Sequence, residues 1–343
     1  MQRLTCAVFL ALALVLAASG AVAAEFTLML AHAGPVSEIN DDYVGATALK
    51  KYVEEKSGGR IKVDIYPGNQ LGNYQEVMEQ IQNDALQAAH TSIDGVTPFL
   101  PELSVLDMQY VIPGDAVVYK FMEGPFFGKL GEAVKGKLSN ARLVGVSDGG
   151  RWRSFFTTRK EVKSAGDLKG LKIRTINSPL QQEFVRQLGG AATPVPWGEL
   201  YTALATGVVD GTKNATPDIM SNKFNESIKF GILDRHTFLF GFYWLSDTWL
   251  NSLPADLQKV VLDGFTQAAA IQTKFNKDQE DKANAAFVAA GGTLHEPTAA
   301  ERATFTGARD AMIAWYKAKY GDTWLKIMLE NVELAKQQAG YKE

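Results

Sequence analysis

The chain has 343 residues, with 35 Lys and Arg side chains against 38 Asp and Glu, and a formal net charge of −3 at pH 7. A slightly acidic chain without a basic run is a poor match for nucleic acid or an anionic membrane, so we expect neither as a partner. The one cysteine, Cys6, excludes a disulfide within the chain.

Residues 1–24 have the pattern of a secretory signal peptide. Arg3 gives a positive start, residues 7–18 are apolar, and Ala23 or Ala24 precedes the expected cleavage site. The apolar run is shorter than the roughly 20 residues that span a bilayer, which argues against a transmembrane anchor. Cleavage would remove the only cysteine and leave about 320 residues, enough for two domains of roughly 150 residues. We therefore expect an exported, soluble, two-domain protein without thiol chemistry.

Helices and strands alternate through the first third of the chain. The apolar stripe of residues 37–57 predicts a helix that stops at a Gly-Gly pair, and "RIKVDIYPG" (60–68) predicts an alternating strand. Asn73 followed by Glu76 has the spacing of a capping box and begins the next helix. "DALQAAHTSI" (84–93) supplies another strand, so the region is predicted to form a βαβ unit.

The middle of the chain predicts a second α/β domain, because strand and helix patterns alternate there again. Two strands, "ARLVGV" (141–146) and "RWRSFFTT" (151–158), come first. The expected elements that follow are the strand "GLKIRT" (170–175), the helix 179–188, the short segment "ATPVPW" (192–197), the helix 199–206 and the turn "GVVDG" (207–211).

Residues 254–292 keep helical spacing between a proline start and a Gly-Gly stop. One continuous helix would be roughly 50 Å long at 1.5 Å per residue, long enough to brace two lobes. A break near Gly264 is the alternative.

The residue types that carry common catalytic chemistry form no recognised motif. The histidines lack metal-ligand spacing, and the chain has no GxSxG elbow, no P-loop and no GxGxxG turn opening a helix. We therefore expect no metal, no cofactor and no enzymatic activity, and the pattern favours a binding protein. The histidines are His32, His90, His236 and His295.

Arg174 stands at the end of a predicted strand, four residues before Ser178, the expected N-cap of the next helix. The end of a strand facing a helix N-terminus is where α/β proteins bind ligands, and the free N–H groups there favour an anion. A guanidinium can hold a carboxylate through two parallel hydrogen bonds. A solvated arginine at a strand end is the alternative, and the residue types alone leave the two about even.

Four segments carry a resemblance to a known family: "YPGNQLGN" (66–73), "DLKGLKIRTINSP" (167–179), "PVPWGELYTALATGVVDG" (194–211) and the helix of residues 254–292. Over essentially its whole length after residue 24, the chain resembles the solute-binding proteins of tripartite ATP-independent periplasmic (TRAP) transporters. The resemblance implies that Arg174 binds the carboxylate of the ligand.

The resemblance also implies an α/β periplasmic binding protein, with two α/β lobes around a ligand cleft, crossing strands and a long interlobe helix. We expect residues 25–150 plus 240–278 to form lobe I and residues 151–239 plus 279–343 to form lobe II. The implied protein is a monomeric receptor in the periplasm that captures a small organic acid and delivers it to TRAP membrane permease subunits. A sensory receptor, or a periplasmic enzyme acting on a carboxylate, is the alternative.

Further cleft residues follow from the resemblance. A second pocket arginine matches Arg153 best, with Arg151 as the competitor because two-residue spacing places both on one strand face. The polar residue after "VDG" is Asn214, next to Lys213, where the family usually has an acidic residue. Trp197 takes the place of a pocket-wall aromatic, and plain core packing is the alternative.

Other polar residues are weaker candidates. His32 and Ser92 end strands at the expected cleft, but either could equally be structural. Asn73 and Glu76 are placed to touch a hydroxylated ligand, although capping already explains them. His236 is expected at a crossing between the lobes in a structural role.

These candidates suit a monocarboxylate with hydroxyl groups, such as a uronic or aldonic acid, because two arginines stand among neutral or hydroxylated neighbours. A C4-dicarboxylate, a keto acid or an aromatic acid is the alternative, the last because of Trp197 and Phe155.

Overall fold

The computed structural model describes residues 24–342, so the predicted signal peptide lies outside the described residues except for Ala24. The strands are β1 (Phe26–Ala31), β2 (Ile61–Tyr66), β3 (Ala88–Thr91), β4 (Ala141–Thr157), β5 (Lys172–Thr175), β6 (Ala191–Pro194), β7 (Gly211–Asn214), β8 (Phe230–Ser246) and β9 (Thr293–His295). The α-helices are α2 (Asp41–Lys56), α3 (Tyr74–Gln82), α4 (Asp115–Glu123), α5 (Phe126–Lys137), α6 (Pro179–Gln187), α7 (Leu200–Ala205), α8 (Thr216–Ser221), α9 (Asp247–Ser252), α10 (Ala255–Ala289), α11 (Ala299–Thr306), α12 (Arg309–Tyr320) and α13 (Thr323–Gln338). Short 3₁₀ helices are η1 (Ile93–Gly95), η2 (Pro101–Asp107), η3 (Ala165–Leu168), η4 (Trp197–Glu199) and η5 (Phe224–Glu226).

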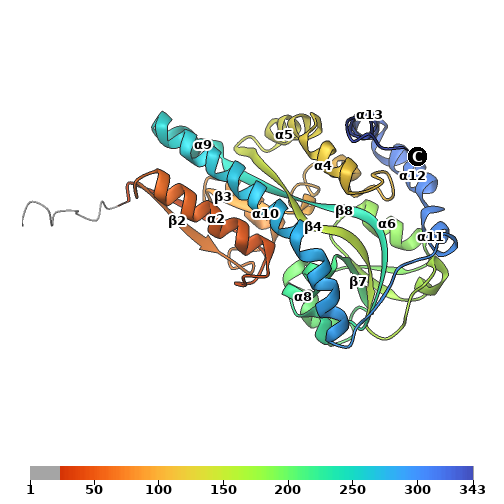
Figure 1. Ribbon diagram of the computed structural model, residues 1–343. Helices are drawn as coiled ribbons and strands as arrows, with labels where there is room; N and C mark the ends of the chain where they lie inside the picture. Colours follow the sequence, from red (N-terminus) through yellow and green to blue (C-terminus); the bar gives the residue numbers. More distant parts are fainter. Residues whose placement is uncertain (1–23, 343) are drawn as a thin grey trace, which may run out of the picture.

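One mixed sheet runs through the described residues in the order β2-β1-β3-β8-β4-β7-β5-β6, with β9 beside β8. At one end β1 pairs in parallel with β2 and β3, and at the other end β5 pairs in parallel with β6 and β7. The long strands β4 and β8 pair antiparallel and join the two ends. The predicted architecture of two α/β lobes connected by crossing strands is therefore confirmed (Figure 1).

Strand β4 is continuous, where the sequence suggested two separate strands. The Ser-Asp-Gly-Gly stretch in its middle forms a bulge, and the register against β8 shifts between Asp148 and Arg151. Asp148 Oδ1 accepts hydrogen bonds from the backbone N–H groups of Gly150 (3.1 Å) and Arg151 (2.7 Å), which fixes the bulge. The two predicted strands are therefore joined through this bulge into one.

Helix α10 is uninterrupted, and its 35 residues span about 52 Å at 1.5 Å each. It runs past both lobes and packs on α2, α8 and β4 (Figure 1). Gly264 faces α2, where a Cβ would lie 2.7 Å from Val53 Cγ2 and 3.1 Å from Leu49 Cδ1. The glycine permits this close approach of two helices without breaking α10, so the predicted long brace is confirmed.

Helix α2 begins at Asp41 rather than at Ser37, because the side chain of Asn40 caps it by accepting from the backbone N–H of Tyr43 at 3.2 Å. Residues 32–40 are consequently a loop that leads from the end of β1 to the helix. The capping box predicted at the start of α3 is present.

Three hydrophobic clusters hold the lobes together. One fills the space between β1, β2, α2 and α10 and contains Leu49 and Phe265. Another joins α7, α8 and the end of α10 through Phe156 and Phe287. The largest cluster, with Phe184 among its members, extends under the crossing strands, where α12 packs on α6 and α13 packs on α4 and α5. The C-terminal helices therefore contact elements of both lobes.

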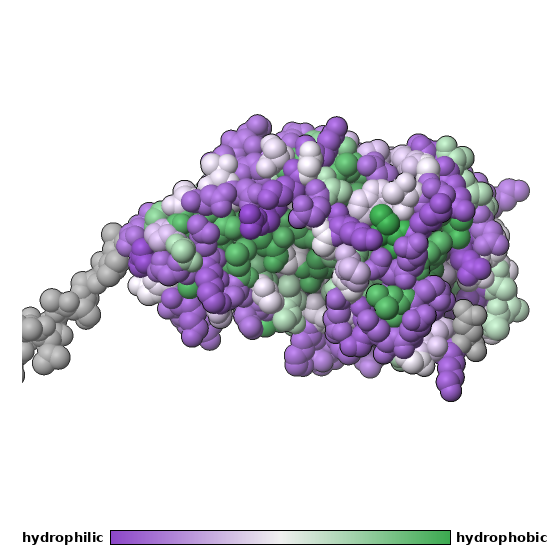
Figure 2. Space-filling model, turned by 90° about the horizontal axis from the view of Figure 1, so that it is seen from above, coloured by the Kyte–Doolittle hydropathy of each residue, from purple (hydrophilic) through white to green (hydrophobic). Residues whose placement is uncertain are grey.

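Polar side chains cover most of the face in Figure 2, and hydrophobic ones gather toward its middle. None of the helices within residues 24–342 combines the length and apolar character needed to span a membrane.

Candidate functional site

A cavity lies between the two lobes, where strands from both lobes end. Its wall is formed by the ends of β3, β5 and β7, the middle of β4 and β8, and the first turn of α2. The cavity measures about 40 Å³, room for only a few water molecules at roughly 10–15 Å³ each. The ionisable side chains that line it are Asp41, Asp42, Tyr74, His90, Asp94, Arg153, Arg174 and Asp218.

Two buried arginines face this cavity without an anionic partner. Arg153 and Arg174 are each 2% exposed, and neither forms an ion pair with a carboxylate in the part of the chain that the structure describes. Arg174 Nε donates to the carbonyl oxygen of Val195 at 2.9 Å. Arg153 Nη1 lies 3.5 Å from Gln181 Oε1, and its Nε has no hydrogen-bond partner among the described residues. Buried cations are costly unless paired, so the arrangement favours an anion in the cavity.

Arg174 also stacks on the predicted wall aromatic. Its guanidinium carbon lies 5.5 Å from the centroid of the Trp197 ring, within the range of a cation–π contact. The half-buried Trp197 packs edge-on against Phe224 at 5.2 Å. Trp197 thus lines the cavity and also packs on Phe224. It is therefore both a pocket-wall aromatic and a packing residue, the two roles considered from the sequence. Burial lowers the pKa of Arg174 to about 10, which leaves it charged at neutral pH.

Carboxyl groups form another part of the wall. Burial raises the pKa of Asp218 well above its usual value, and the nearby Asp41 adds to the rise. Burial likewise raises the pKa of Asp41 and of Asp94. Protonated carboxyl groups can donate as well as accept hydrogen bonds, so this wall suits hydroxyl groups.

Asp42 differs from these three carboxyl groups because it has a histidine partner. Burial by itself would raise the pKa of Asp42, but the charge and hydrogen bond of His90 outweigh it and hold that pKa low. The Asp42 carboxylate lies 2.8 Å from His90 Nδ1. Within residues 24–342, no group of three or more His, Cys, Asp or Glu side chains is arranged to hold a metal ion.

Asn214 ends β7 and is 2% exposed. Its Nδ2 donates to Asp218 Oδ2 at 3.1 Å, and its Oδ1 accepts from the Thr212 hydroxyl at 2.8 Å. Helix α8 begins directly after β7, so the turn between them brings Asn214 and Asp218 together at the cavity.

The cavity brings together Arg153, Arg174, Asn214, Trp197 and Ser92 of the residues predicted from the sequence. The Ser92 hydroxyl donates to the Asp94 carboxylate, a neighbour on the same loop. These residues come from β4, β5, the end of β7, the start of η4 and the end of β3, so widely separated segments meet at one place.

Other predicted residues lie elsewhere. His32 is buried, with Nδ1 4.0 Å from the Asp42 carboxylate, but is not among the residues that line the cavity. Asn73 and Glu76 are exposed and satisfy each other as a capping box, at 3.1 and 2.7 Å. Of these two, Asn73 lines a second cavity that adjoins the first. Ser178 caps α6 by accepting from the Gln181 backbone N–H at 3.4 Å.

His236 and Phe155, both named from the sequence, are not among the residues that line the cavity. His236, on β8, lies 2.9 Å from Asp234 and packs on Phe155, with ring centroids 4.8 Å apart. Phe155 therefore belongs to the core and not to the cavity wall.

Arg151 and Arg153 do not share a face of β4, contrary to the expectation from their spacing. Arg151 has a φ of +78° within the bulge, which breaks the alternation of the strand. Its guanidinium pairs with Asp115 (2.6 Å) and Glu280 in a separate cavity near α4 and α10. The geometry therefore favours Arg153 as the second arginine of the interlobe cavity.

Several lining residues were not found from the sequence. Asp218 follows Asn214 by four residues, and Tyr74 directly follows the predicted cap Asn73. Asn40 was not recognised as a cap or a lining residue, because the helix was predicted to begin at Ser37. The strand-to-helix turns next to predicted residues were the signal that could have located these side chains.

A second cavity of about 210 Å³ adjoins the first and shares Tyr74, Asp94 and Trp197 with it. Together the two adjoining cavities approach the volume of about 300 Å³ at which ligand pockets begin.

The fold and the site together define a two-lobed binding protein with two buried arginines at the cavity between its lobes. The sequence pattern described as "Bacterial extracellular solute-binding protein, family 7" matches residues 32–320, and the chain belongs to this family. Its members include the solute-binding proteins of TRAP transporters.

The comparison with individual proteins agrees. The chain is 29% identical over 292 residues to a solute-binding protein of Verminephrobacter eiseniae, covering 85% of this chain and 84% of that protein. Its fold is similar to a TRAP solute-binding protein of Anaerococcus prevotii with bound D-glucuronate, at a TM-score of 0.84 and 24% identity, covering 91% and 99% of the two chains. It is also similar to a sugar acid binding protein of Advenella mimigardefordensis in complex with galactonate, at a TM-score of 0.86 and 20% identity, with the same coverage.

Proposed function

We propose that this receptor of a TRAP transporter captures a uronic or aldonic sugar acid in the periplasm and delivers it to the membrane permease. The observation that carries the proposal is the pair of buried arginines, Arg153 and Arg174, which line one cavity without a carboxylate partner among the described residues. A ligand carboxylate would bind the planar guanidinium of Arg174 and gain positive potential from Arg153.

The rest of the wall supports a ligand with several hydroxyl groups. Asn214 presents an amide at the end of β7, and Ser92 and Tyr74 present hydroxyl groups. The carboxyl groups of Asp94 and Asp218 would accept from ligand hydroxyls, or donate to them when protonated. A hydroxyl can play either role, so a polyhydroxylated chain matches this mixed wall better than an apolar one.

A dicarboxylate has weaker support. Its second carboxylate would need its own cation, and the arginines are the only lysine or arginine side chains among the described residues that line the cavity. Away from them the wall carries Asp42, whose pKa is held low and whose charge would repel a second carboxylate. The sugar acids bound by the two structural neighbours, glucuronate and galactonate, have one carboxylate and several hydroxyls.

Delivery to the permease and the periplasmic location are supported by the family and by the signal-peptide pattern of residues 1–24. A two-lobed receptor can present its closed, loaded form to a membrane partner, because the ligand stabilises only the state in which both lobes contact it.

A thermal-shift panel tests the proposed ligand class. The purified protein would be heated with glucuronate, galacturonate, galactonate, succinate, malate, pyruvate and an aromatic acid, each in excess. A ligand that binds only the folded protein raises the melting temperature. We expect the sugar acids to raise it most, and a larger shift with succinate or malate would contradict the proposal.

A further inference from the structure

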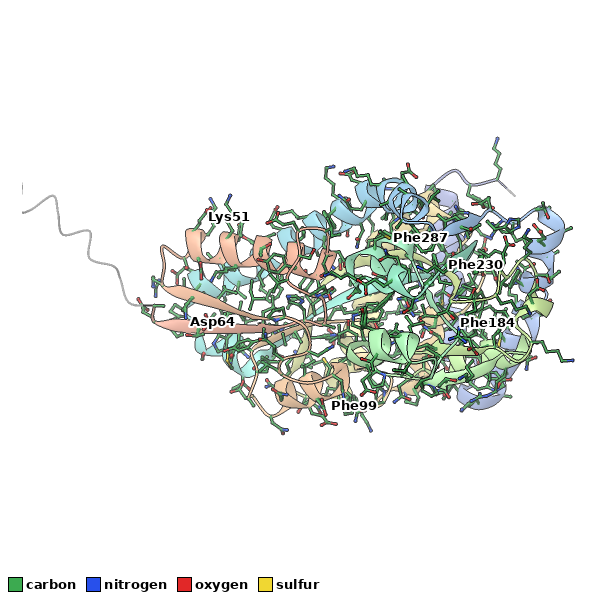
Figure 3. The ribbon with its side chains drawn as sticks, turned by 90° about the horizontal axis from the view of Figure 1, so that it is seen from below. Lys51, Asp64, Phe99, Phe184, Phe230 and Phe287 are labelled. Atoms are coloured by element: carbon green, nitrogen blue, oxygen red, sulfur yellow. The ribbon has the colours of Figure 1, made fainter. Side chains whose placement is uncertain are left out.

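Lys213 is a buried cation that the cavity wall does not include. It precedes Asn214 on β7 and is 1% exposed, yet no carboxylate within residues 24–342 forms an ion pair with it. Its Nζ donates to Gln181 Oε1 at 2.9 Å and lies 5.9 Å from the centroid of the Phe184 ring. Phe184 is in the second lobe, at the opposite end of the molecule from the labelled Lys51 and Asp64 (Figure 3). A buried ammonium group with one neutral acceptor is costly, so its presence calls for a role.

Gln181 connects this lysine to the binding site. The same oxygen, Oε1, lies 3.5 Å from Arg153 Nη1, so two cations share one amide oxygen. On its other side, Gln181 Nε2 donates to Asp107 Oδ1 at 2.8 Å, which fixes the direction of the amide. Gln181 itself is 1% exposed and stands in the first turn of α6, which Ser178 caps.

We propose that Lys213 is a positioning residue of the anion site: by occupying the Gln181 oxygen, it keeps the Arg153 guanidinium turned toward the cavity and adds positive charge behind it. The inference rests on the proposed function, because it requires an anion in the cavity. With Lys213 removed, Arg153 would be free to bind Gln181 Oε1 at full strength and withdraw from the ligand. Repulsion between the two cations opposes that movement while Lys213 is present.

The charged groups around Lys213 couple it to the ligand. Arg153 faces it from β4, Arg174 from β5, Asp107 from η2, and Asp234 and His236 from β8. Burial lowers the pKa of Lys213 well below 10.5; the two arginines lower it further, and the two aspartates oppose them. A bound anion would stabilise the charged ammonium.

Titration calorimetry with Lys213→Met tests the proposal, because methionine preserves the length of the side chain and removes its charge. The probe is whichever of glucuronate, galacturonate, galactonate or succinate the unmodified protein binds most tightly. Lys172→Met is the matched control, since Lys172 is an exposed lysine on the neighbouring strand β5.

We expect Lys213→Met to lose affinity by tenfold or more. Lys172→Met should bind as tightly as the unmodified protein. Affinity of Lys213→Met within twofold of the unmodified protein would overturn the inference. If the unmodified protein bound none of these acids, the proposed function would fail and this inference with it.

The melting temperature without ligand separates positioning from a merely structural role. Removing a buried unpaired charge should leave the melting temperature of Lys213→Met equal or raise it. If this variant does not fold, Lys213→Gln removes the charge and keeps a polar side chain, and the same loss of affinity is expected. An unchanged affinity of folded Lys213→Gln would overturn the inference.

Discussion

Arg153 and Arg174 lie on strands β4 and β5, which flank β7 in the sheet, and both side chains reach the cavity beside the end of β7. Asn214, the last residue of β7, lines the cavity with them. The proposed anion site thus combines residues from three separate strands. Burial is the main cause of the lowered pKa of Arg174; the nearby Asp94 opposes this effect, and repulsion by Arg153 adds to it.

Arg174→Met should abolish high-affinity binding while the protein still folds. The ligand carboxylate would lose its charge-assisted partner, at a cost of about 2–5 kcal/mol in calorimetry. The melting temperature of the free protein should stay the same or rise, because a buried unpaired cation is removed. Arg174→Lys should also bind weakly, since an ammonium cannot form the planar two-bond contact.

The control is Arg159→Met, because Arg159 is an exposed arginine two residues after the end of β4. It should bind as tightly as the unmodified protein. Binding by Arg174→Met within a few-fold of the control would contradict the assigned role.

Trp197 should report ligand binding by its fluorescence. Its ring stacks on Arg174 and lines both adjoining cavities, so a ligand bound at Arg174 should change its surroundings. We expect a change in intrinsic fluorescence with the unmodified protein and a much smaller one with Trp197→Phe. An equal change in both proteins would place the signal on another tryptophan and count against movement of this wall.

The stability of the protein should depend on pH through Asp218. Burial raises its pKa well above 3.8, so the folded protein holds this proton more tightly than the unfolded chain. The stability that the proton contributes is complete below pH 3.8 and is lost as the pH rises through the folded pKa. Asp218→Asn cannot titrate there, so its free energy of unfolding should fall less as the pH rises.

Urea denaturation between pH 5 and 9 measures this difference. Asp310→Asn is the control, since the Asp310 side chain is 87% exposed and should leave the pH profile unchanged. Parallel curves for Asp218→Asn and the unmodified protein would show that Asp218 does not hold the proton.

Much of this fold was predictable because its signals are local. The capping box of Asn73 and Glu76 fixed the start of α3, and regular helical spacing gave α10 in spite of Gly264. The bulge in β4 was not predictable, because it depends on Asp148 binding the backbone N–H groups of its own strand. Two-residue spacing placed Arg151 and Arg153 on one face of the strand. The bulge breaks that alternation, so spacing alone could not decide which arginine lines the cavity.

In the candidate site, too, some residues could be predicted from local sequence and others could not. Arg174 and Asn214 lie at strand ends within recognisable segments, so their place at the cavity could be predicted from the sequence. The carboxyl groups of Asp41 and Asp42 could not, because they reach the cavity only when α2 begins after the Asn40 cap. Their role depends on which elements face each other across the cleft, and no local pattern records that.

Ligand should close the two lobes. The side chain of Asn40, before α2, lies 3.5 Å from the Ser221 hydroxyl of α8, a contact that joins elements of different lobes. A ligand that binds Arg174 in one lobe and Asp41 in the other would favour this closed arrangement. We expect a smaller radius of gyration in X-ray scattering with ligand than without it, and no change with Arg174→Met. Identical curves for the unmodified protein with and without saturating ligand would exclude closure.

The most direct measurement compares each acid with its uncharged counterpart in calorimetry: glucuronate with glucose, and galactonate with galactitol. If the buried arginines recognise a carboxylate, the acids should bind and the neutral compounds should bind about 30-fold more weakly or not at all, which corresponds to about 2 kcal/mol. Equal binding of the neutral compounds, or no binding of any acid, would contradict the assignment of Arg153 and Arg174 as an anion site.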